Sequence, residues 1–207
     1  MRLHYHPASN ASHLVRATAA LLDVPLDLRR VDLLGGENHQ ESYLALNPNG
    51  LVPTLEDDGF VLWESAAIAQ YLASKRREPE LLPSEPRARA EVTRWQCWAL
   101  AHWIPTTGVL VYECFFKALK GQGEADPDAV GRARRDLARH SRVLETALAA
   151  SRFLVGERLT LADLSVAVGF SYDRYAPLPL EDRPNLRRWF GQISSLPAWS
   201  STAPALD

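Results

Sequence analysis

The segment from Ala45 to Leu72 constrains the fold more than any other part of the chain. It begins with Asn-Pro-Asn-Gly, which is typical of a turn because asparagine and glycine tolerate positive φ and proline fixes φ. Two short apolar runs joined by Asp-Asp-Gly then predict a β-hairpin, and an alanine-rich helix follows. The predicted elements are a strand entered at 52–55, a turn at 57–60, a second strand at 60–63 and a helix opening at 64–65.

Two features of this segment indicate a ligand site. Pro53 forfeits a ladder hydrogen bond at the start of a strand, so the residues before it can offer backbone N–H and C=O groups to a ligand. Ser65 opens a helix whose N-terminal N–H groups suit an anion, and Glu64 beside it suits an ammonium group. Together they fit an amino acid or a small peptide. A plain strand-entry proline followed by a capped helix explains the same residues equally well.

The composition limits the classes of protein. The chain has 207 residues, enough for one large or two small domains, with 46% hydrophobic and 23% charged residues and a formal net charge of −2. This charge disfavours nucleic acid and anionic membranes as partners, and no apolar run reaches the roughly 18 residues of a membrane span. The N-terminal sequence MRLHYHPAS also lacks the apolar segment of a signal peptide, so a cytoplasmic location is predicted.

Cysteine and histidine usage predicts no metal site. The two cysteines, Cys97 and Cys114, lie far apart in apolar helical sequence, and we expect both to be buried free thiols in a reducing compartment. The six histidines are scattered, and no H-x-x-x-H or H-E-x-x-H motif occurs.

The order of predicted elements indicates two domains. The first part reads βαβαββα, which makes a small mixed sheet: the βαβ unit gives a parallel pair and the hairpin adds antiparallel strands. A charged, proline-rich stretch without periodicity follows, and everything beyond it reads as helix. The predicted organisation is an α/β domain at 1–78, a linker at 79–86 and an all-α helical bundle at 87–207, whose last clear helix spans 184–196.

Three local signals organise the helical part. Trp95, Trp98 and His102 recur at three- and four-residue steps and therefore share one helix face. Pro105 is expected to kink or break that helix. Thr160-Leu-Ala-Asp163 is similar to a capping box at the start of an almost wholly apolar, central helix.

Three motifs in this order give the chain a resemblance over its whole length to the cytosolic glutathione transferases. They are NPNGLVPTL followed by ESAAIAQYL, GERLTLADLSVA, and RPNLRRWFGQISSLPA. The resemblance implies a thioredoxin-like first domain that binds glutathione and an all-helical second domain. The sequence SNASHLVR looks like the Ser-type pattern of the theta and zeta classes, so the chain is identified as resembling a bacterial, Ser-type member.

The resemblance also implies roles for individual residues. Pro53 would be a cis-proline that leaves Val52 to pair through its backbone with the cysteinyl part of glutathione. Glu64 and Ser65 would hold the γ-glutamyl ammonium and carboxylate groups. The full glutathione-binding set implied in this way is Asn38 or His39 beside the glycyl carboxylate, together with Leu51, Val52, Pro53, Glu64 and Ser65.

The residue that activates the glutathione thiol is predicted in the loop after the first strand, where the candidates are Ser9, Asn10 and Ser12. A free thiol has a pKa of about 8.5, so a hydroxyl that donates to the sulfur at a helix N-terminus favours the reactive thiolate. We interpret Ser9 as the activator and Ser12 as the helix N-cap. Because no cysteine occupies this loop, conjugation or isomerisation is favoured over thiol–disulfide exchange, and the departure from the SSCS motif of the zeta class disfavours maleylacetoacetate isomerisation.

The predicted activity is conjugation of glutathione, as co-substrate, to a small hydrophobic electrophile in a homodimeric enzyme. Alternatives are a glutathione-dependent isomerase, a reductase or peroxidase, and a non-catalytic binding module of the same fold. Aromatic side chains on the long helix suit an apolar electrophile, although tryptophans at helical spacing are usually core residues. The predicted electrophile pocket comprises Ala8, His102, Trp103, Thr106, Tyr112 and Phe116.

Overall fold

In the computed structural model, which describes residues 1–76 and 80–206, the chain forms two compact units. The first unit comprises Met1–Leu82 together with the residues from Pro197 onward, and the second comprises Pro83–Leu196. The predicted domain boundary at 78/79 lies outside the described residues.

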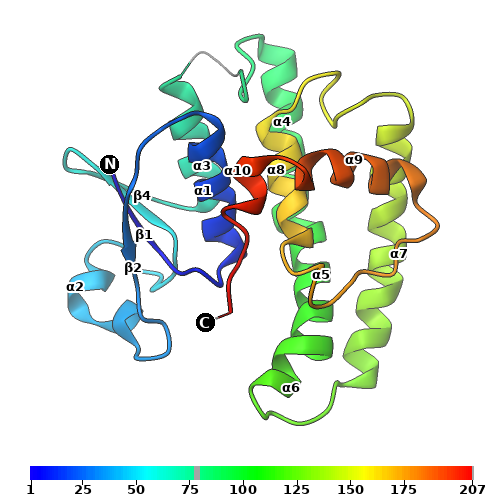
Figure 1. Cartoon of the computed structure of the whole chain (residues 1–207), viewed down its shortest axis with the longest axis horizontal. Helices are drawn as coiled ribbons and strands as arrows, with labels where there is room; N and C mark the ends of the chain where they lie inside the picture. Colours follow the sequence, from blue (N-terminus) through cyan, green and yellow to red (C-terminus); the bar gives the residue numbers. More distant parts are fainter. Residues whose placement is uncertain (77–79, 207) are drawn as a thin grey trace. The chain divides into compact units, whose positions relative to one another are not determined.

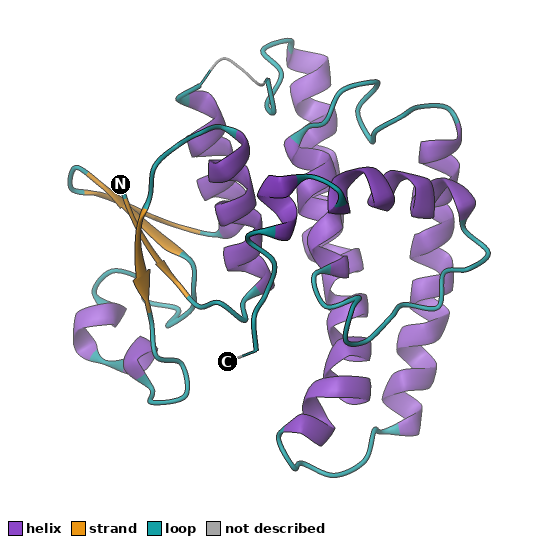
Figure 2. Cartoon of the chain, in the orientation of Figure 1, coloured by secondary structure: helices purple, strands orange, loops and turns teal. Residues whose placement is uncertain are grey.

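The first unit is a four-stranded mixed sheet with helices packed against it (Figures 1 and 2). The strand order is β2-β1-β3-β4, with β1 and β2 parallel and the other two pairs antiparallel, as the βαβαββα prediction requires. Its elements are β1 (Arg2–Tyr5), α1 (Asn10–Leu21), β2 (Asp27–Arg30), the 3₁₀ turn η1 (Glu37–His39), α2 (Glu41–Leu44), β3 (Thr54–Asp57), β4 (Phe60–Trp63), α3 (Ser65–Ser74) and α10 (Pro197–Ser200).

The predicted hairpin is confirmed. The two residues between β3 and β4, Asp58 and Gly59, have φ values of 48° and 85°, as a two-residue turn with left-handed central residues requires. Helices α1 and α3 lie side by side on one face of the sheet (Figure 1). The core beneath them is apolar, and its fully buried members include Leu3, Leu55 and Ile68.

The C-terminal segment belongs to the first unit, whereas the sequence placed it in the helical domain. The imidazole Nε2 of His13, on α1, donates to the carbonyl oxygen of Trp199 at 3.0 Å, and the two rings, tilted by 50°, lie 4.1 Å apart between centroids. Arg16 Nη1 donates to the Thr202 carbonyl at 3.3 Å. Burial lowers the pKa of His13 to about 4. The prediction failed because these pairings join residues more than 180 positions apart, which local patterns do not encode.

The second unit is entirely helical. Its elements are α4 (Pro86–Trp98), the π turn η2 (Ala99–Trp103), α5 (Ile104–Val111), the π turn η3 (Tyr112–Phe116), α6 (Lys117–Leu119), α7 (Pro127–Ala149), α8 (Leu161–Ala167), the 3₁₀ turn η4 (Val168–Phe170) and α9 (Pro184–Ser194). This architecture confirms the predicted all-α second part.

The helix from Pro86 to Leu119 runs through Pro105 without a break, contrary to one of the two outcomes predicted for that proline. The π turn η2 comes directly before it and closes with a hydrogen bond from Ile104 N–H to the Ala99 carbonyl. A wider π turn changes the bonding register where proline lacks its donor, so the chain stays helical.

The predicted capping box at α8 is confirmed. Thr160 accepts from the Ala162 N–H, while the Asp163 carboxylate accepts from the N–H and hydroxyl of Thr160 at 2.9 and 3.0 Å. Asp163 also accepts from Leu154 N–H and Trp189 Nε1–H, both at 2.8 Å. Burial raises the pKa of this carboxyl group, and the four hydrogen bonds oppose that rise.

The core of the second unit is built on Trp103, which is fully buried and donates its Nε1–H to the Val166 carbonyl at 3.0 Å. Gly169 makes this possible, because a Cβ there would lie 2.2 Å from the indole nitrogen. Cys97 and Cys114 are both exposed free thiols, so the prediction of buried cysteines was wrong; each lies on an outward position of its helical turn.

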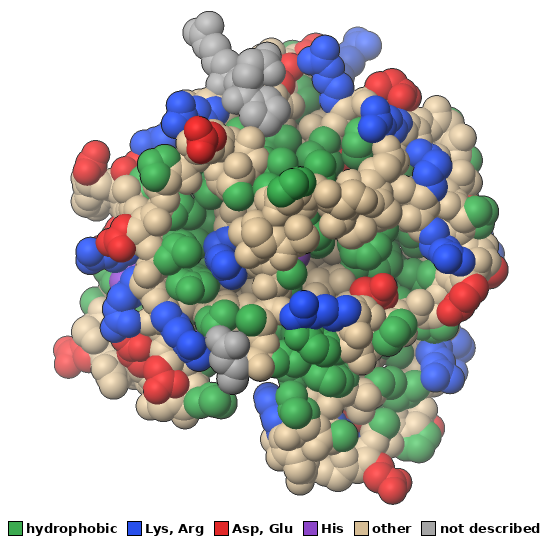
Figure 3. All heavy atoms as spheres, in the orientation of Figure 1, with side chains coloured by type: hydrophobic (Ala, Val, Ile, Leu, Met, Phe, Trp, Pro, Cys, Tyr) green, Lys and Arg blue, Asp and Glu red, His purple; other side chains and the backbone are tan. Residues whose placement is uncertain are grey.

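None of the described helices is long and apolar enough to cross a bilayer. On the face drawn in Figure 3, basic and acidic side chains are interspersed, in keeping with the small net charge of the sequence.

Candidate functional site

Strand register brings three segments to one edge of the sheet. His4 on β1 pairs with Thr54 on β3, and Thr54 pairs with Trp63 on β4, so these residues form a row across three strands. The chain leaves β1 toward Ser9, enters β3 from Val52 and leaves β4 at Glu64, all just beyond this row. The sheet therefore gathers the predicted activating loop, the proline segment and the helix start that the sequence separates by many residues.

Val52 presents an unpaired backbone at this edge. The Val52–Pro53 peptide bond is cis, as the resemblance implied, and β3 begins only at Thr54. Neither the N–H nor the C=O of Val52 has a hydrogen-bond partner among the described residues. A half-buried donor and acceptor on one residue next to a strand suit an extended peptide that adds to the sheet.

Three buried side chains hold the loop before Val52, and sequence reasoning missed their role. The Leu51 carbonyl accepts from Tyr43 Oη at 2.7 Å and from Asn47 Nδ2 at 2.8 Å. The Gly50 carbonyl accepts from Asn38 Nδ2 at 2.7 Å. The Gly50 and Leu51 carbonyls are therefore satisfied internally, whereas the N–H and C=O of Val52 stay open to a ligand. The Asn-Pro-Asn-Gly turn was the one sequence signal that pointed to this loop.

Asn38 and His39 differ in burial. The sequence left both as candidates for the residue beside the glycyl carboxylate. The Asn38 side chain is buried and committed to the loop, whereas His39 is exposed next to it. Gly50, with φ of 61°, fits closely against both, since a Cβ there would lie 3.1 Å from the Asn38 carbonyl oxygen and from His39 Nδ1. Of the two, His39 is the side chain that a ligand can reach.

Helix α3 begins at the same edge with unpaired donors. Glu64 is its N-cap residue and Ser65 is its first helical residue, so the helix opens at 64–65 as predicted. The Glu64 side chain makes no capping hydrogen bond, and the first N–H groups of α3 find no acceptor in the described part of the chain. Free N–H groups at the positive end of a helix dipole favour a carboxylate.

Ser9 is the N-cap of α1, and Ser12 is not, which reverses the predicted cap. Ser9 Oγ accepts from the Ser12 N–H at 3.1 Å. Ser12 is fully buried, and its hydroxyl oxygen lies 3.4 Å from the His6 N–H. Asn10 is half-buried at the first helical position. The Ser9 oxygen uses one lone pair for the cap, so its hydroxyl hydrogen can still donate to a ligand.

The residues predicted for the electrophile pocket differ in accessibility. Trp103 is wholly enclosed in the core of the second unit, and Thr106 is buried with its hydroxyl 3.2 Å from His140 Nδ1. His102 is exposed, Tyr112 is 40% exposed, and Phe116 packs edge-on against Tyr172 at 4.9 Å. The electrophile pocket, which also includes Ala8, stays a prediction.

Within residues 1–76 and 80–206, no group of three or more His, Cys, Asp or Glu side chains is arranged to hold a metal ion. The polar groups gathered at the sheet edge are hydroxyl, carboxylate and backbone groups instead. They can bind an ammonium group, a carboxylate and a peptide backbone at once, and they can place a hydroxyl donor beside a thiol.

Comparison with known proteins identifies the family. A family model described as glutathione S-transferase, N-terminal domain, matches residues 3–80, and one described as glutathione S-transferase, C-terminal domain, matches residues 105–197. A glutathione S-transferase of Hyoscyamus muticus is 31% identical, with 97% of this chain and 96% of the relative covered. The glutathione S-transferase GstB of Escherichia coli is also 31% identical, over 92% of each chain.

A solved structure agrees with these sequence matches. Glutathione transferase F2 of Populus trichocarpa superposes with a TM-score of 0.91 at 28% identity, covering 97% of this chain and 96% of the other. With both domain models matched in order and relatives of 31% identity covered almost from end to end, the chain belongs to the glutathione S-transferase family.

Proposed function

We propose that this protein is a glutathione transferase that joins the glutathione sulfur to a small hydrophobic electrophile. The observation that carries the proposal is the sheet edge, where Val52, Glu64 and Ser65 offer three different kinds of contact. The unpaired Val52 backbone suits the cysteinyl residue, and the open N-terminus of α3 with the Ser65 hydroxyl suits the γ-glutamyl carboxylate. Glu64 pairs with the ammonium group of the same γ-glutamyl residue.

The glycyl end of glutathione is assigned to His39 rather than Asn38. The amide of Asn38 holds the Gly50 carbonyl inside the loop, so its replacement would move the loop instead of removing one ligand contact. His39 is exposed beside it and can donate to a carboxylate. In this proposal Asn38, Tyr43 and Asn47 are positioning residues that keep the Val52 backbone extended.

Ser9 activates the thiol. Its oxygen already accepts from the Ser12 N–H, which fixes the side chain, and its hydroxyl hydrogen then donates to the glutathione sulfur. Donation to the sulfur and the positive end of α1 both favour the thiolate, and each pKa unit by which the thiol is lowered corresponds to about 1.4 kcal/mol. This role supports the Ser-type assignment, and the theta- or zeta-like class is proposed on the SNAS sequence alone.

The chemical step forms one bond. The thiolate electron pair attacks the electrophilic carbon, and either a leaving group departs with its bonding pair or an activated double bond takes up the pair and then a proton. The protein contributes thiol activation and proximity of the two reactants. The homodimer implied by the resemblance and the predicted cytoplasmic location are part of the same proposal.

The test compares wild type with Ser9→Ala by following the thiolate absorbance of bound glutathione as pH is varied. Loss of the hydroxyl is expected to raise the bound thiol pKa by about 1 to 2 units, and to lower kcat/KM at neutral pH by about 10- to 100-fold. Glutathione affinity should change little, because Ser9 does not hold the γ-glutamyl or glycyl groups.

Asn10→Ala is the matched control, since Asn10 is the next residue of the same loop. An unchanged thiol pKa in Ser9→Ala, together with a raised one in Asn10→Ala, would transfer the activating role to Asn10. Glutathione binding without turnover over a panel of electrophiles would instead favour the non-catalytic alternative.

A further inference from the structure

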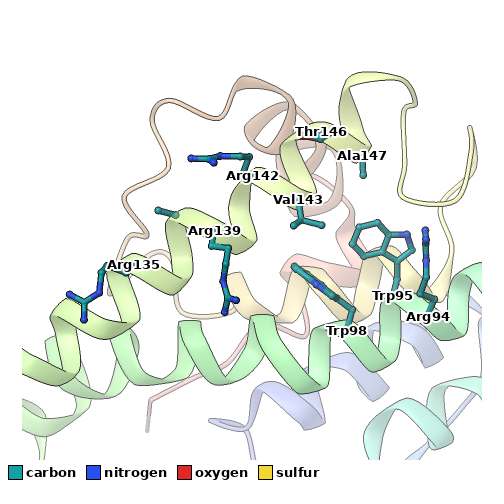
Figure 4. Close-up of a pocket in the computed structure, with 10 residues that line it drawn as sticks. Arg94, Trp95, Trp98, Arg135, Arg139, Arg142, Val143, Thr146 and Ala147 are labelled. Atoms are coloured by element: carbon teal, nitrogen blue, oxygen red, sulfur yellow. The ribbon is translucent and has the colours of Figure 1, made fainter.

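Two histidine rings meet inside the second unit, where the long helix packs against α7. His102 on η2 and His140 on α7 lie 5.6 Å apart between ring centroids, with their planes tilted by 46°. The indole of Trp98 packs against both rings, at 6.2 Å from His102 and 5.8 Å from His140. Figure 4 shows Trp98 rising from α4 toward α7. The two histidines are far apart in the sequence, so no local motif could reveal the pair.

A buried hydroxyl fixes the tautomer of His140. Thr106 Oγ1 donates its one hydrogen to the His102 carbonyl oxygen at 2.8 Å. His140 Nδ1 lies 3.2 Å from the same hydroxyl oxygen, so Nδ1 must carry a hydrogen and donate it. In the neutral imidazole, Nε2 then holds the free lone pair. The Thr106 hydroxyl therefore orients the His140 ring and ties it to the backbone of His102.

The Nε2 atom of His140 is open to a ligand, although the residue is only 6% exposed. It has no hydrogen-bond partner in the described part of the chain. The side-chain atoms there that are both buried and unpartnered are Asn38 Oδ1 and Trp95 Nε1, so His140 Nε2 reaches the surface. His102 is exposed, and its ring forms no hydrogen bond with any described residue. The His102 ring can therefore turn to present a nitrogen beside His140 Nε2.

The surroundings keep the His140 imidazole neutral near pH 7. Burial is the main cause that lowers the pKa of His140, and Arg139 and His102 act in the same direction. Asp136, one helical turn before His140, opposes them and pairs with Arg139 at 3.1 Å, so these two side chains together add little net charge. A metal ion binds only the deprotonated nitrogen of an imidazole, so a neutral His140 suits metal ligation.

The arrangement of the pair matches that of histidines that bind a metal ion. Such a histidine almost always donates its second ring N–H to an oxygen atom, as His140 does to Thr106. With Zn–N bonds of about 2.1 Å in tetrahedral geometry, two imidazoles on one zinc ion have centroids about 5.3 Å apart. The observed separation of 5.6 Å is close to this value. Imidazole ligands favour zinc and neighbouring transition metals over calcium and magnesium.

We propose that His102 and His140 bind a divalent transition-metal ion of the zinc class, and that Thr106 positions the His140 ring for it. Water completes the coordination, because no third His, Cys, Asp or Glu of the described residues is arranged to join the pair. The ion links η2 to α7 and so stabilises the folded second unit. This proposal departs from the expectation of no metal site, which rested on contiguous sequence motifs.

The test is isothermal titration of the full chain with zinc chloride near neutral pH, in a protein carrying Cys97→Ser and Cys114→Ser to remove the two exposed thiols. One ion per chain is expected. Adding His102→Ala should abolish this binding, and adding Thr106→Val should weaken it by about 10-fold, because the His140 ring loses the acceptor that orients it. Zinc should also raise the thermal unfolding midpoint of the double-serine protein but not that of its His102→Ala variant.

Thr107→Val is the matched control. Thr107 is buried like Thr106, but its hydroxyl donates to the Ile104 carbonyl at 3.2 Å and contacts no histidine, so zinc affinity should be unchanged. Zinc affinity that survives His102→Ala, or that falls equally in Thr106→Val and Thr107→Val, would overturn the proposal. Zinc binding is measured without glutathione, so the result does not depend on the proposed function.

Discussion

Glu64 has φ of 73° and ψ of 111°, a backbone conformation that residues with a Cβ rarely adopt. Only three described non-glycine residues have positive φ, and the other two, Asp23 and Asp58, lie in turns. Such conformations persist where the surrounding structure imposes them, and they cluster at binding sites. Here Glu64 is the single residue between the end of β4 and the start of α3, so it stands at the open N-terminus of the helix.

Replacing Glu64 with glycine should change the stability of the protein and its affinity for glutathione in opposite directions. Glu64→Gly relieves the positive φ and should raise the free energy of unfolding by about 1 kcal/mol. It should also weaken glutathione binding by about 10-fold, because the partner of the ammonium group is lost. Urea unfolding and glutathione titration of the same protein measure the two effects.

Glu64→Gln is the control, since it keeps the Cβ and removes only the charge. Its unfolding free energy should equal that of wild type while its glutathione affinity falls. If Glu64→Gly binds glutathione as tightly as wild type, the carboxylate does not hold the ammonium group.

For individual residues, the sequence indicated which residues form the candidate site better than it indicated what each of them does there. Val52, Glu64 and Ser65 were singled out because proline, a carboxylate and a hydroxyl have distinctive chemistry at the ends of elements. Ser9 and Ser12 were assigned opposite capping roles, because two serines three residues apart both fit the helix start. The roles of Tyr43 and Asn47 could not be predicted, since their partners depend on the exact path of the loop.

Among the elements, α8 is fixed by a single carboxylate. Asp163 ties the first turn of α8 to Leu154 and, through the Trp189 indole, to α9. The capping box could be predicted from Thr160 and Asp163 because both partners lie within one turn of helix. The hydrogen bonds from Leu154 and Trp189 could not be predicted, because they join separate segments.

Asp163→Asn should cost about 3 kcal/mol of unfolding free energy, well above the roughly 1 kcal/mol expected for Thr160→Ala. The amide nitrogen of asparagine cannot accept the two bonds from Thr160, and both donors would then be buried without a partner. Chemical unfolding of both variants measures the difference. Equal losses in the two variants would mean that burying the two Thr160 donors without an acceptor costs little.

In the long helix from α4 to α6, the local sequence did not determine the structure. Pro105 correctly signalled a local irregularity, but its outcome was a π turn rather than a break. Whether a proline ends a helix depends on the packing of the residues beyond it, and here Trp103 and Leu110 are buried on either side. Periodicity alone does not contain that information.

For the whole molecule, the pairing of His13 with Trp199 makes stability depend on pH. His13 is protonated near pH 6.5 in the unfolded chain but only near pH 4 in the folded protein, because burial lowers its pKa to about 4. The contribution of His13 to the free energy of unfolding is therefore complete above pH 6.5. It is lost as the pH falls toward 4, by up to about 3 kcal/mol.

The measurement is urea unfolding of wild type and His13→Gln between pH 7 and pH 4. Glutamine keeps an N–H donor for the Trp199 carbonyl and does not titrate, so the stability of wild type relative to the variant should fall across this range. His39→Gln, at an exposed histidine, should track wild type at every pH. A constant difference between wild type and His13→Gln would rule out the titration of His13 as the cause.

The return of the C-terminal segment to the first unit makes residues 83–196 an insertion within that unit. During synthesis, the ribosome completes the entire helical unit before it supplies Trp199 and Thr202. Chains generally fold as units while they are being made, so the helical unit has all of its sequence available first. The first unit, although its sequence begins the chain, is therefore completed after the helical unit. The hydrogen bond between His13 and the Trp199 carbonyl can form only once Trp199 has been synthesised.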